Sequence, residues 1–274
     1  MHHSPPIEKE KKEEIVISRT TLRGACAAAT AVISLTLCTS CSAPPESVDL
    51  APLQALRAEC DPDQLEVDFV ALDSSNSSDS DAIHQSRLAV LEELARRSVV
   101  CEGRIVVVRF TSTAASTDTV IDESFALAGA TDNAKLRRAP DEIARVQTLL
   151  TDEVDGSASS LPEGGSDVLG MYNLAAQLVG QLKGPAALHV TLLTDGFTNV
   201  GIKLDRKTKI DDVDGLVDAT DVPDLPGASI TVAGLGDVAG KAVRSSAVEA
   251  LIAYYDGICD KAKAASCVSV TDWR

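Results

Sequence analysis

A short polar run that follows an apolar one is the part of the sequence best suited to chemistry. Residues 73–77, with the sequence DSSNS, offer one carboxylate, three hydroxyls and one amide, and they directly follow the apolar run 67–72, which only Asp68 interrupts. Oxygen atoms of these kinds are the ligands that hard cations such as Mg²⁺ prefer in proteins. The run therefore predicts cation binding, while a Ser-rich turn that binds nothing stays open as the alternative.

The elements that would position these oxygens are a strand and the loop after it, over residues 65–77. A run of β-branched and aliphatic residues that breaks into polar ones is typical of a buried parallel strand that meets a loop at its carboxyl end. Ligands of open α/β sheets bind outside that end of the strands. The polar run therefore lies where such a fold would hold a ligand.

Two later segments bring further oxygen-bearing side chains. Ser166, in the sequence GGSD, precedes a helix predicted over residues 168–182, and Asp195, in the sequence TDG, follows an apolar strand predicted over residues 187–193. If the strands before Asp73 and Asp195 are parallel strands of one α/β sheet, all three segments lie at the carboxyl edge of that sheet. We therefore expect Ser166 and Asp195 to surround the same point as the DSSNS run.

The rest of the sequence alternates strand and helix patterns. Short apolar runs predict strands, and apolar residues at helical spacing predict helices. Further strands are expected at 104–110, 120–127 and 228–236, and further helices at 79–97, 141–154, 211–219 and 247–264. The pattern predicts an α/β fold with a doubly wound, mainly parallel sheet, helices on both faces, and an edge strand at 120–127.

In type and order, these residues resemble the metal-ion-dependent adhesion site of the von Willebrand factor A (VWA) domain family, whose DxSxS signature matches Asp73-x-Ser75-x-Ser77. The resemblance implies that Ser75 and Ser77 bind the metal through their hydroxyls. It also implies that Ser166 is a ligand, and that Asp73 and Asp195 bind the metal or hold its waters. The implied metal is Mg²⁺, with Mn²⁺ or Ca²⁺ as alternatives.

One position departs from that family. Ser166 stands where the family usually has Thr, so the hydroxyl is kept but the methyl group that helps to fix its rotamer is lost. The adjacent Asp167 is an alternative ligand. The resemblance covers roughly residues 65–264, and the fold that it implies is the VWA/Rossmann-like one.

A site of this composition suits the capture of a carboxylate better than the activation of water. Neutral hydroxyls and only two carboxylates leave Mg²⁺ electron-poor, so that an open coordination position attracts an acidic side chain. The sequence places no general base nearby, because His84 falls in a predicted helix and His189 in a predicted strand. We expect a binding module for a protein partner with an acidic side chain, and not an enzyme.

Two other functions are weighed against that one. The first is a Mg²⁺-dependent phosphohydrolase that uses Asp73 as a nucleophile; such enzymes usually carry a second Asp two residues on, where this chain has Ser75. The second is a structural cell-envelope scaffold with a vestigial metal site. The net charge of −16 argues against a nucleic-acid partner, which needs a basic surface.

The N-terminal part has the pattern of an export signal. Residues 1–23 are polar and charged and are expected to be a disordered cytoplasmic region, residues 24–41 a signal or membrane anchor, residues 42–59 a tether, and residues 60–274 the folded domain. The segment before Cys41 resembles a bacterial lipobox, so Cys41 is the predicted lipidation site. A single N-terminal membrane helix is the alternative, and both place the domain at the extracytoplasmic face of a bacterial cell membrane.

Four well-separated cysteines lie in the predicted domain, which in an exported protein indicates two disulfides. Cys60 and Cys101 each precede a strand. If those strands are parallel neighbours, both cysteines lie at the amino edge of the sheet and are positioned to pair. Cys259 and Cys267 flank the end of the last helix and would close a local loop.

Overall fold

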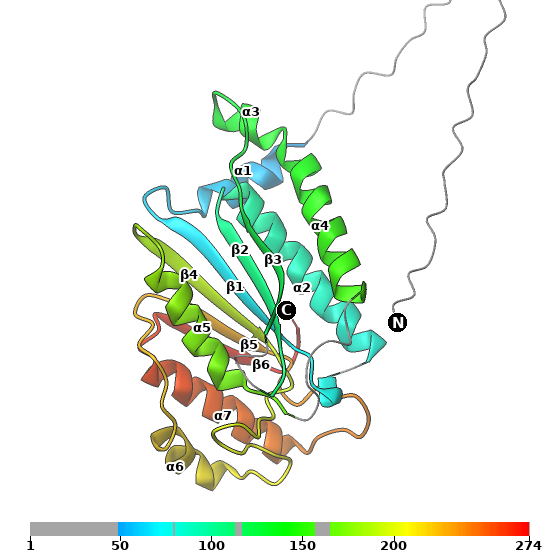
Figure 1. Ribbon diagram of the computed structural model, residues 1–274, viewed down its shortest axis with the longest axis vertical. Helices are drawn as coiled ribbons and strands as arrows, with labels where there is room; N and C mark the ends of the chain where they lie inside the picture. The colour runs from blue at the N-terminus through cyan, green and yellow to red at the C-terminus, as the bar shows by residue number, and fades with distance from the viewer. Residues whose placement is uncertain (1–48, 79, 113–116, 157–164, 274) are drawn as a thin grey trace, which may run out of the picture. The chain divides into compact units, whose positions relative to one another are not determined.

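A six-stranded sheet forms the centre of the structure, a computed structural model that describes residues 49–78, 80–112, 117–156 and 165–273 (Figure 1). The strand order is β3-β2-β1-β4-β5-β6, with β3 antiparallel to β2 and the other neighbours parallel. The strands are β1 (Leu65–Asp73), β2 (Arg104–Phe110), β3 (Asp118–Ser124), β4 (Ala186–Leu193), β5 (Ser229–Ala233) and β6 (Ser266–Val270). This order confirms the predicted doubly wound α/β fold, and its topological switch point lies between β1 and β4.

Helices cover both faces of the sheet, as Figure 1 shows. One face carries α1 (Ala51–Ala58), α2 (Asp81–Val100), α3 (Asp132–Leu136) and α4 (Ala139–Gly156), and the other carries α5 (Val168–Gly180), α6 (Val213–Asp218) and α7 (Ser245–Lys261). Two short 3-10 helices, η1 (Asn76–Ser78) and η3 (Ile210–Asp212), lie in loops. Each face has its own apolar core, as expected for a sheet that is buried on both sides.

Strand β1 is the central strand, and its sequence explains why. From Glu66 to Asp73 every residue is buried, and successive side chains enter opposite cores: Phe69 joins the core under α5 and α7, while Val70 joins the core under α2. A strand buried on both faces needs apolar residues at nearly every position rather than alternating ones. The carboxyl end of β1, at Asp73, therefore lies between the neighbouring strands β2 and β4.

Both predicted disulfides are present. Cys60 and Cys101 are bonded with their Cα atoms 5.5 Å apart, and they precede the parallel neighbours β1 and β2 as the prediction requires. Cys259 and Cys267 are bonded with their Cα atoms 6.0 Å apart, and they tie the end of α7 to β6.

Two features differ from the sequence prediction. Helix α1 lies inside the expected tether 42–59, where a short helix near residues 53–59 was also expected, and its Leu53 is 6% exposed because it packs into the core under α2. Strand β6 was not predicted, because its sequence SCVSV is short and its serines, Ser266 and Ser269, do not alternate with apolar residues.

The predictions for residues 1–23, 24–41 and Cys41 lie outside the described residues. Within the described ranges, no helix combines the length and the apolar character that a membrane crossing requires.

Candidate metal-binding site

Asp73 links the three segments that the sequence prediction brought together. It is the last residue of β1 and is fully buried. Its Oδ2 accepts hydrogen bonds from the hydroxyls of Ser166, at 3.0 Å, and Thr194, at 2.6 Å, while its Oδ1 accepts one from the Ser75 N–H, at 2.9 Å. The ends of β1 and β4 and the start of α5 therefore meet at this carboxylate.

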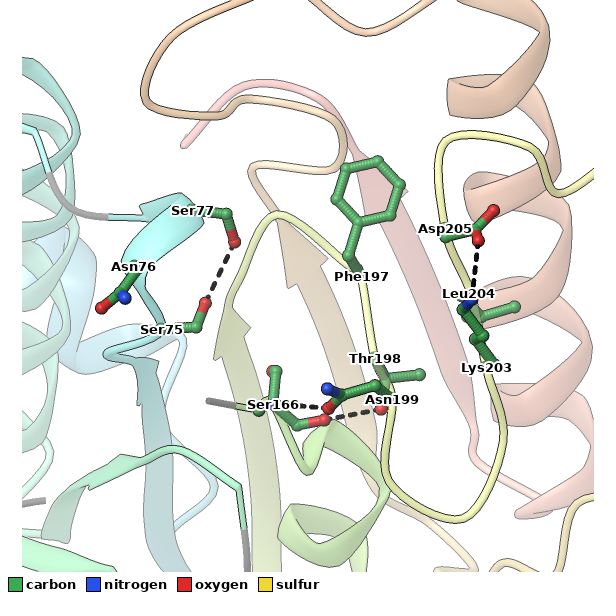
Figure 2. Close-up of a pocket in the computed structure, with 11 residues that line it drawn as sticks. Ser75, Asn76, Ser77, Ser166, Phe197, Thr198, Asn199, Lys203, Leu204 and Asp205 are labelled. Atoms are coloured by element: carbon green, nitrogen blue, oxygen red, sulfur yellow. Dashed lines mark hydrogen bonds and ion pairs between the residues drawn. The ribbon is translucent and has the colours of Figure 1, made fainter. Parts of the chain in front are cut away.

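Ser75 and Ser77 present their hydroxyls side by side (Figure 2). Their Oγ atoms lie 3.2 Å apart, a hydrogen-bond distance that leaves lone pairs on both oxygens. The loop turns through the single-turn helix η1 directly after Ser75, and the Ser77 carbonyl is fixed by the Ala239 N–H at 2.7 Å. The predicted ligands Ser75 and Ser77 therefore converge as the spacing requires.

Ser166 is held by both of its backbone groups. Its N–H donates to Asn199 Oδ1 at 3.2 Å, and its carbonyl accepts from Thr198 Oγ1 at 2.6 Å. Its side chain is 5% exposed and donates to Asp73. A loop after β4 thus positions the Ser166 backbone, and the hydrogen bond to Asp73 orients its hydroxyl.

Asp167, the alternative ligand to Ser166, has another role. It is the N-cap of α5, and its Oδ1 accepts a hydrogen bond from the Gly170 N–H at 2.9 Å. Its own N–H donates to the Thr111 carbonyl at 2.7 Å. A capping carboxylate stabilises the helix start, so Ser166 rather than Asp167 stays the candidate ligand.

Asp195 is the most unusual group of the site. It is fully buried; its Oδ1 accepts from the Phe197 N–H at 2.9 Å, but its Oδ2 has no hydrogen-bond partner among the described residues. Burial, and then the negative charge of Asp73, raise the pKa of Asp195 to about 6, against partial compensation from the Ser77 hydroxyl. A buried carboxylate oxygen without a partner is costly, and a bound cation would remove that cost.

Gly196 fixes the turn that carries Asp195. Its φ is +81°, and a Cβ there would lie 2.4 Å from Leu235 Cδ2, so only glycine fits. Its carbonyl accepts a hydrogen bond from the buried Tyr255 hydroxyl at 2.9 Å. The sequence TDG at the end of β4 is therefore required by packing as well as by chemistry.

Arg87 was missed by the sequence prediction. It is 5% exposed on α2; its Nη1 donates to the Asp73 main-chain carbonyl at 2.6 Å, and its guanidinium lies 4.8 Å from the ring centroid of Trp273. Trp273 in turn donates to Asp237 Oδ2 at 2.7 Å. The sequence signal for a buried Arg87 was its spacing: it lies four residues from both Ile83 and Leu91, on the buried face of α2.

The donor set fits a hard cation. Asp73, Ser75, Ser77, Ser166 and Asp195 contribute only oxygen, and Asp195 Oδ2 is a buried oxygen without a protein partner in the described residues. The described residues contain no group of three or more His, Cys, Asp or Glu side chains that could hold a metal ion. Any cation at this edge of the sheet would therefore depend on hydroxyl ligands.

A pocket of about 270 Å³ opens next to these oxygens. Figure 2 shows Ser75 and Ser77 on one side and the loop after β4 on the other, with Ser166 below. The lining residues are Ser75, Asn76, Ser77, Gly165, Ser166, Phe197, Thr198, Asn199, Lys203, Leu204 and Asp205. The hydroxyls of the candidate site are therefore accessible from outside.

Comparisons with known proteins found no matching family model and no matching curated protein. Among solved structures, the chain is similar to the conserved hypothetical protein BatB from Bacteroides thetaiotaomicron (14% identity, 76% of this chain, 91% of that chain, TM-score 0.42). It is also similar to an aerotolerance-related membrane protein from Bacteroides fragilis (16% identity, 76% of this chain, 92% of that chain, TM-score 0.42). A third similar structure is the manganese-loaded TRAP protein from Plasmodium vivax (14% identity, 69% of this chain, 63% of that chain, TM-score 0.37). At these TM-scores the fold rests on the strand order and not on the matches.

Proposed function

We propose that this chain is a binding module that captures an acidic side chain of a protein partner through a divalent cation. The residues that would hold the cation are Asp73, Ser75, Ser77, Ser166 and Asp195. The observation that carries the proposal is the buried Asp195 Oδ2, which has no hydrogen-bond partner among the described residues in a site whose other side chains offer hydroxyls and a second carboxylate.

The chemistry of the donor set favours Mg²⁺, with Mn²⁺ or Ca²⁺ as alternatives. When bound, the cation would supply an electrophilic position for a partner carboxylate. The protein residues would orient it: Asp73 ties the hydroxyl of Ser166 to β1, and η1 holds Ser75 and Ser77 side by side. The resemblance to VWA domains supports the same assignment.

Capture fits the site better than catalysis does. The Asp73 carboxylate is fully buried and already accepts three hydrogen bonds, which disfavours a nucleophilic role. His189 belongs to a different cluster on β4, where its Nε2 lies 2.8 Å from Glu66 Oε2. His84 lies within helix α2.

The location of the protein remains a proposal as well. Two disulfides fit an oxidising compartment, which supports an extracytoplasmic domain. The domain would be attached to a bacterial cell membrane by a lipid on Cys41 or by an N-terminal membrane helix.

Isothermal titration calorimetry of the full-length chain with Mg²⁺ and Mn²⁺ tests the cation site. We expect binding by the wild type and its loss in Asp195→Asn, which keeps the shape of the side chain and removes its charge. Asp205→Asn is the matched control, because Asp205 lines the same pocket at its exposed rim. A wild type that binds neither ion, or an Asp195→Asn variant that binds as tightly, contradicts the proposal.

Affinity capture from membrane extracts tests the partner. The wild type with Mg²⁺ should retain a protein that is lost with EDTA and with Asp73→Ala. A cooperative thermal unfolding transition in the same buffer would show that the Asp73→Ala variant is folded. If EDTA leaves the retained proteins unchanged, the scaffold alternative is the better account.

A further inference from the structure

The pocket beside the candidate cation site has two unlike walls. One wall consists of the hydroxyl-bearing residues Ser75, Ser77 and Ser166, and the other is the loop 197–205 (Figure 2). The hydroxyl wall serves the cation. The loop wall supports Ser166 and Asp195 through backbone and polar contacts, and its side chains that face the pocket can select what else enters.

The loop wall is rigid and presents apolar groups. Thr198 and Leu204 pair through both backbone groups, at 3.2 and 2.8 Å, and Leu204 is 1% exposed in the core. Phe197 is fixed through its N–H, which donates to Asp195 Oδ1 at 2.9 Å, while its ring is partly buried and lines the pocket. An aromatic ring that lines the pocket favours contact with an apolar group.

The charges at the rim of this wall cancel. Lys203 Nζ lies 3.2 Å from Asp205 Oδ2, and both side chains are exposed. The whole chain carries a net charge of −16, so ligands with several negative charges are repelled. The cation is therefore the one strong attraction for a single carboxylate, and further affinity has to come from apolar contact.

The size of the pocket limits the apolar group. Its volume of about 270 Å³ lies just below the range of about 300 to 1,000 Å³ that is usual for drug-sized ligands. The space suits one acidic group with one neighbouring aliphatic group, rather than a nucleotide or a large cofactor.

We propose that the pocket binds a single carboxylate that carries an adjacent aliphatic group, as an acidic residue next to an aliphatic one would present on a protein partner. The carboxylate would reach the cation, and the aliphatic group would pack against the ring of Phe197. This inference rests on the proposed function, because the cation holds the carboxylate.

A series of monocarboxylates tests the proposal on the full-length chain with saturating Mg²⁺. Acetate, butyrate and 4-methylpentanoate are titrated, and binding is followed by amide chemical shifts in NMR spectra. We expect affinity to rise by up to about fourfold for each methylene that the pocket buries, so that 4-methylpentanoate binds at least about tenfold more tightly than acetate. Glutarate, with a second carboxylate, should bind more weakly than 4-methylpentanoate.

Variants locate the apolar contact. Phe197→Ala should reduce the ratio between the affinities for 4-methylpentanoate and acetate by at least about threefold. Val268→Ala is the matched control, because Val268 is an exposed apolar residue on β6 and should leave the ratio unchanged.

The outcomes separate this inference from the proposed function. Mg²⁺ binding together with equal affinities along the series, or with glutarate as the tightest ligand, overturns the aliphatic pocket and leaves the cation site standing. A chain that binds no Mg²⁺ overturns both.

Discussion

Strands β1 and β4, with the residues that follow β4, carry two buried carboxylate clusters, and the two clusters are built in opposite ways. In the amino half of the sheet, Glu66 and Asp68 of β1 meet a cation from the protein itself: Arg97 donates to Glu66 at 2.6 Å and to Asp68 at 3.0 Å. Ser98 and His189 complete this cluster, with Ser98 2.6 Å from Asp68 and His189 2.8 Å from Glu66.

At the carboxyl edge, Asp73 and Asp195 have no such partner for their carboxylates among the described residues. Hydroxyls and backbone N–H groups surround them, and Asp195 Oδ2 is left over. The buried Arg87 donates to the main-chain carbonyl of Asp73, and its charge only partly offsets the raised pKa of Asp195. Where the chain supplies its own cation the carboxylates are structural, and the proposed function assigns an external cation to the carboxylates that hydroxyls surround.

The largest expected effect comes from removing Arg97. Arg97→Ala leaves Glu66 and Asp68 buried without their cation, and we expect the free energy of unfolding in urea to fall by about 3 kcal/mol. Arg96→Ala is the matched control, because Arg96 pairs with Glu93 at the surface and should cost less than about 1 kcal/mol. Equal costs for the two variants would show that the amino cluster is not held by its ion pairs.

Arg87 tests whether the protein already neutralises the carboxyl-edge site. Arg87→Met removes the donor to the Asp73 carbonyl, and we expect a loss of about 2 kcal/mol in unfolding free energy. Mg²⁺ binding should persist, since a neighbouring positive charge repels a cation. Loss of Mg²⁺ binding in a folded Arg87→Met chain would break the distinction between the clusters.

The same carboxylate-to-amide change should have opposite signs in the two clusters. Glu66→Gln weakens contacts to Arg97 and His189, and should destabilise the protein by about 1 kcal/mol. Asp195→Asn removes a buried charge without a partner cation, and should stabilise the metal-free protein by a similar amount. Urea unfolding in EDTA measures both, and a shared sign would contradict the comparison.

The smallest effect is a pH dependence in the amino cluster. Burial raises the pKa of Asp68, and Arg97 and Ser98 only partly offset this. A raised pKa means that the stabilisation by Asp68 is fully present below its unfolded pKa of 3.8 and is lost as the pH rises through the folded pKa. Relative to Asp68→Asn, the wild type should therefore lose stability as the pH rises from the unfolded pKa of 3.8 towards the folded pKa, and a gain in its relative stability over that rise would contradict this.

Sequence patterns predicted the parts of the site that lie at strand ends. The apolar run before Asp73 and the run before Asp195 both ended in polar residues, and parallel topology brings such ends together. Cys60 and Cys101 were paired by the same reasoning about the opposite edge.

The contacts that the sequence did not predict depend on packing between distant segments. Arg87 reaches Asp73 from a helix, and Asn199 reaches Ser166 from a loop that has no periodic pattern. Strand β6 is an edge strand with partly exposed residues, so its pattern is weak.

The central claim is that the carboxyl-edge carboxylates need a divalent cation, and thermal unfolding of the full-length chain with and without Mg²⁺ tests it most directly. Binding to the folded state stabilises it by about 2.7 kcal/mol at a concentration 100 times the Kd, so the midpoint of the wild type should rise with Mg²⁺ and saturate. Asp195→Asn should remove this rise, while Glu66→Gln should keep it. A wild-type midpoint that Mg²⁺ and Mn²⁺ leave unmoved would contradict the account.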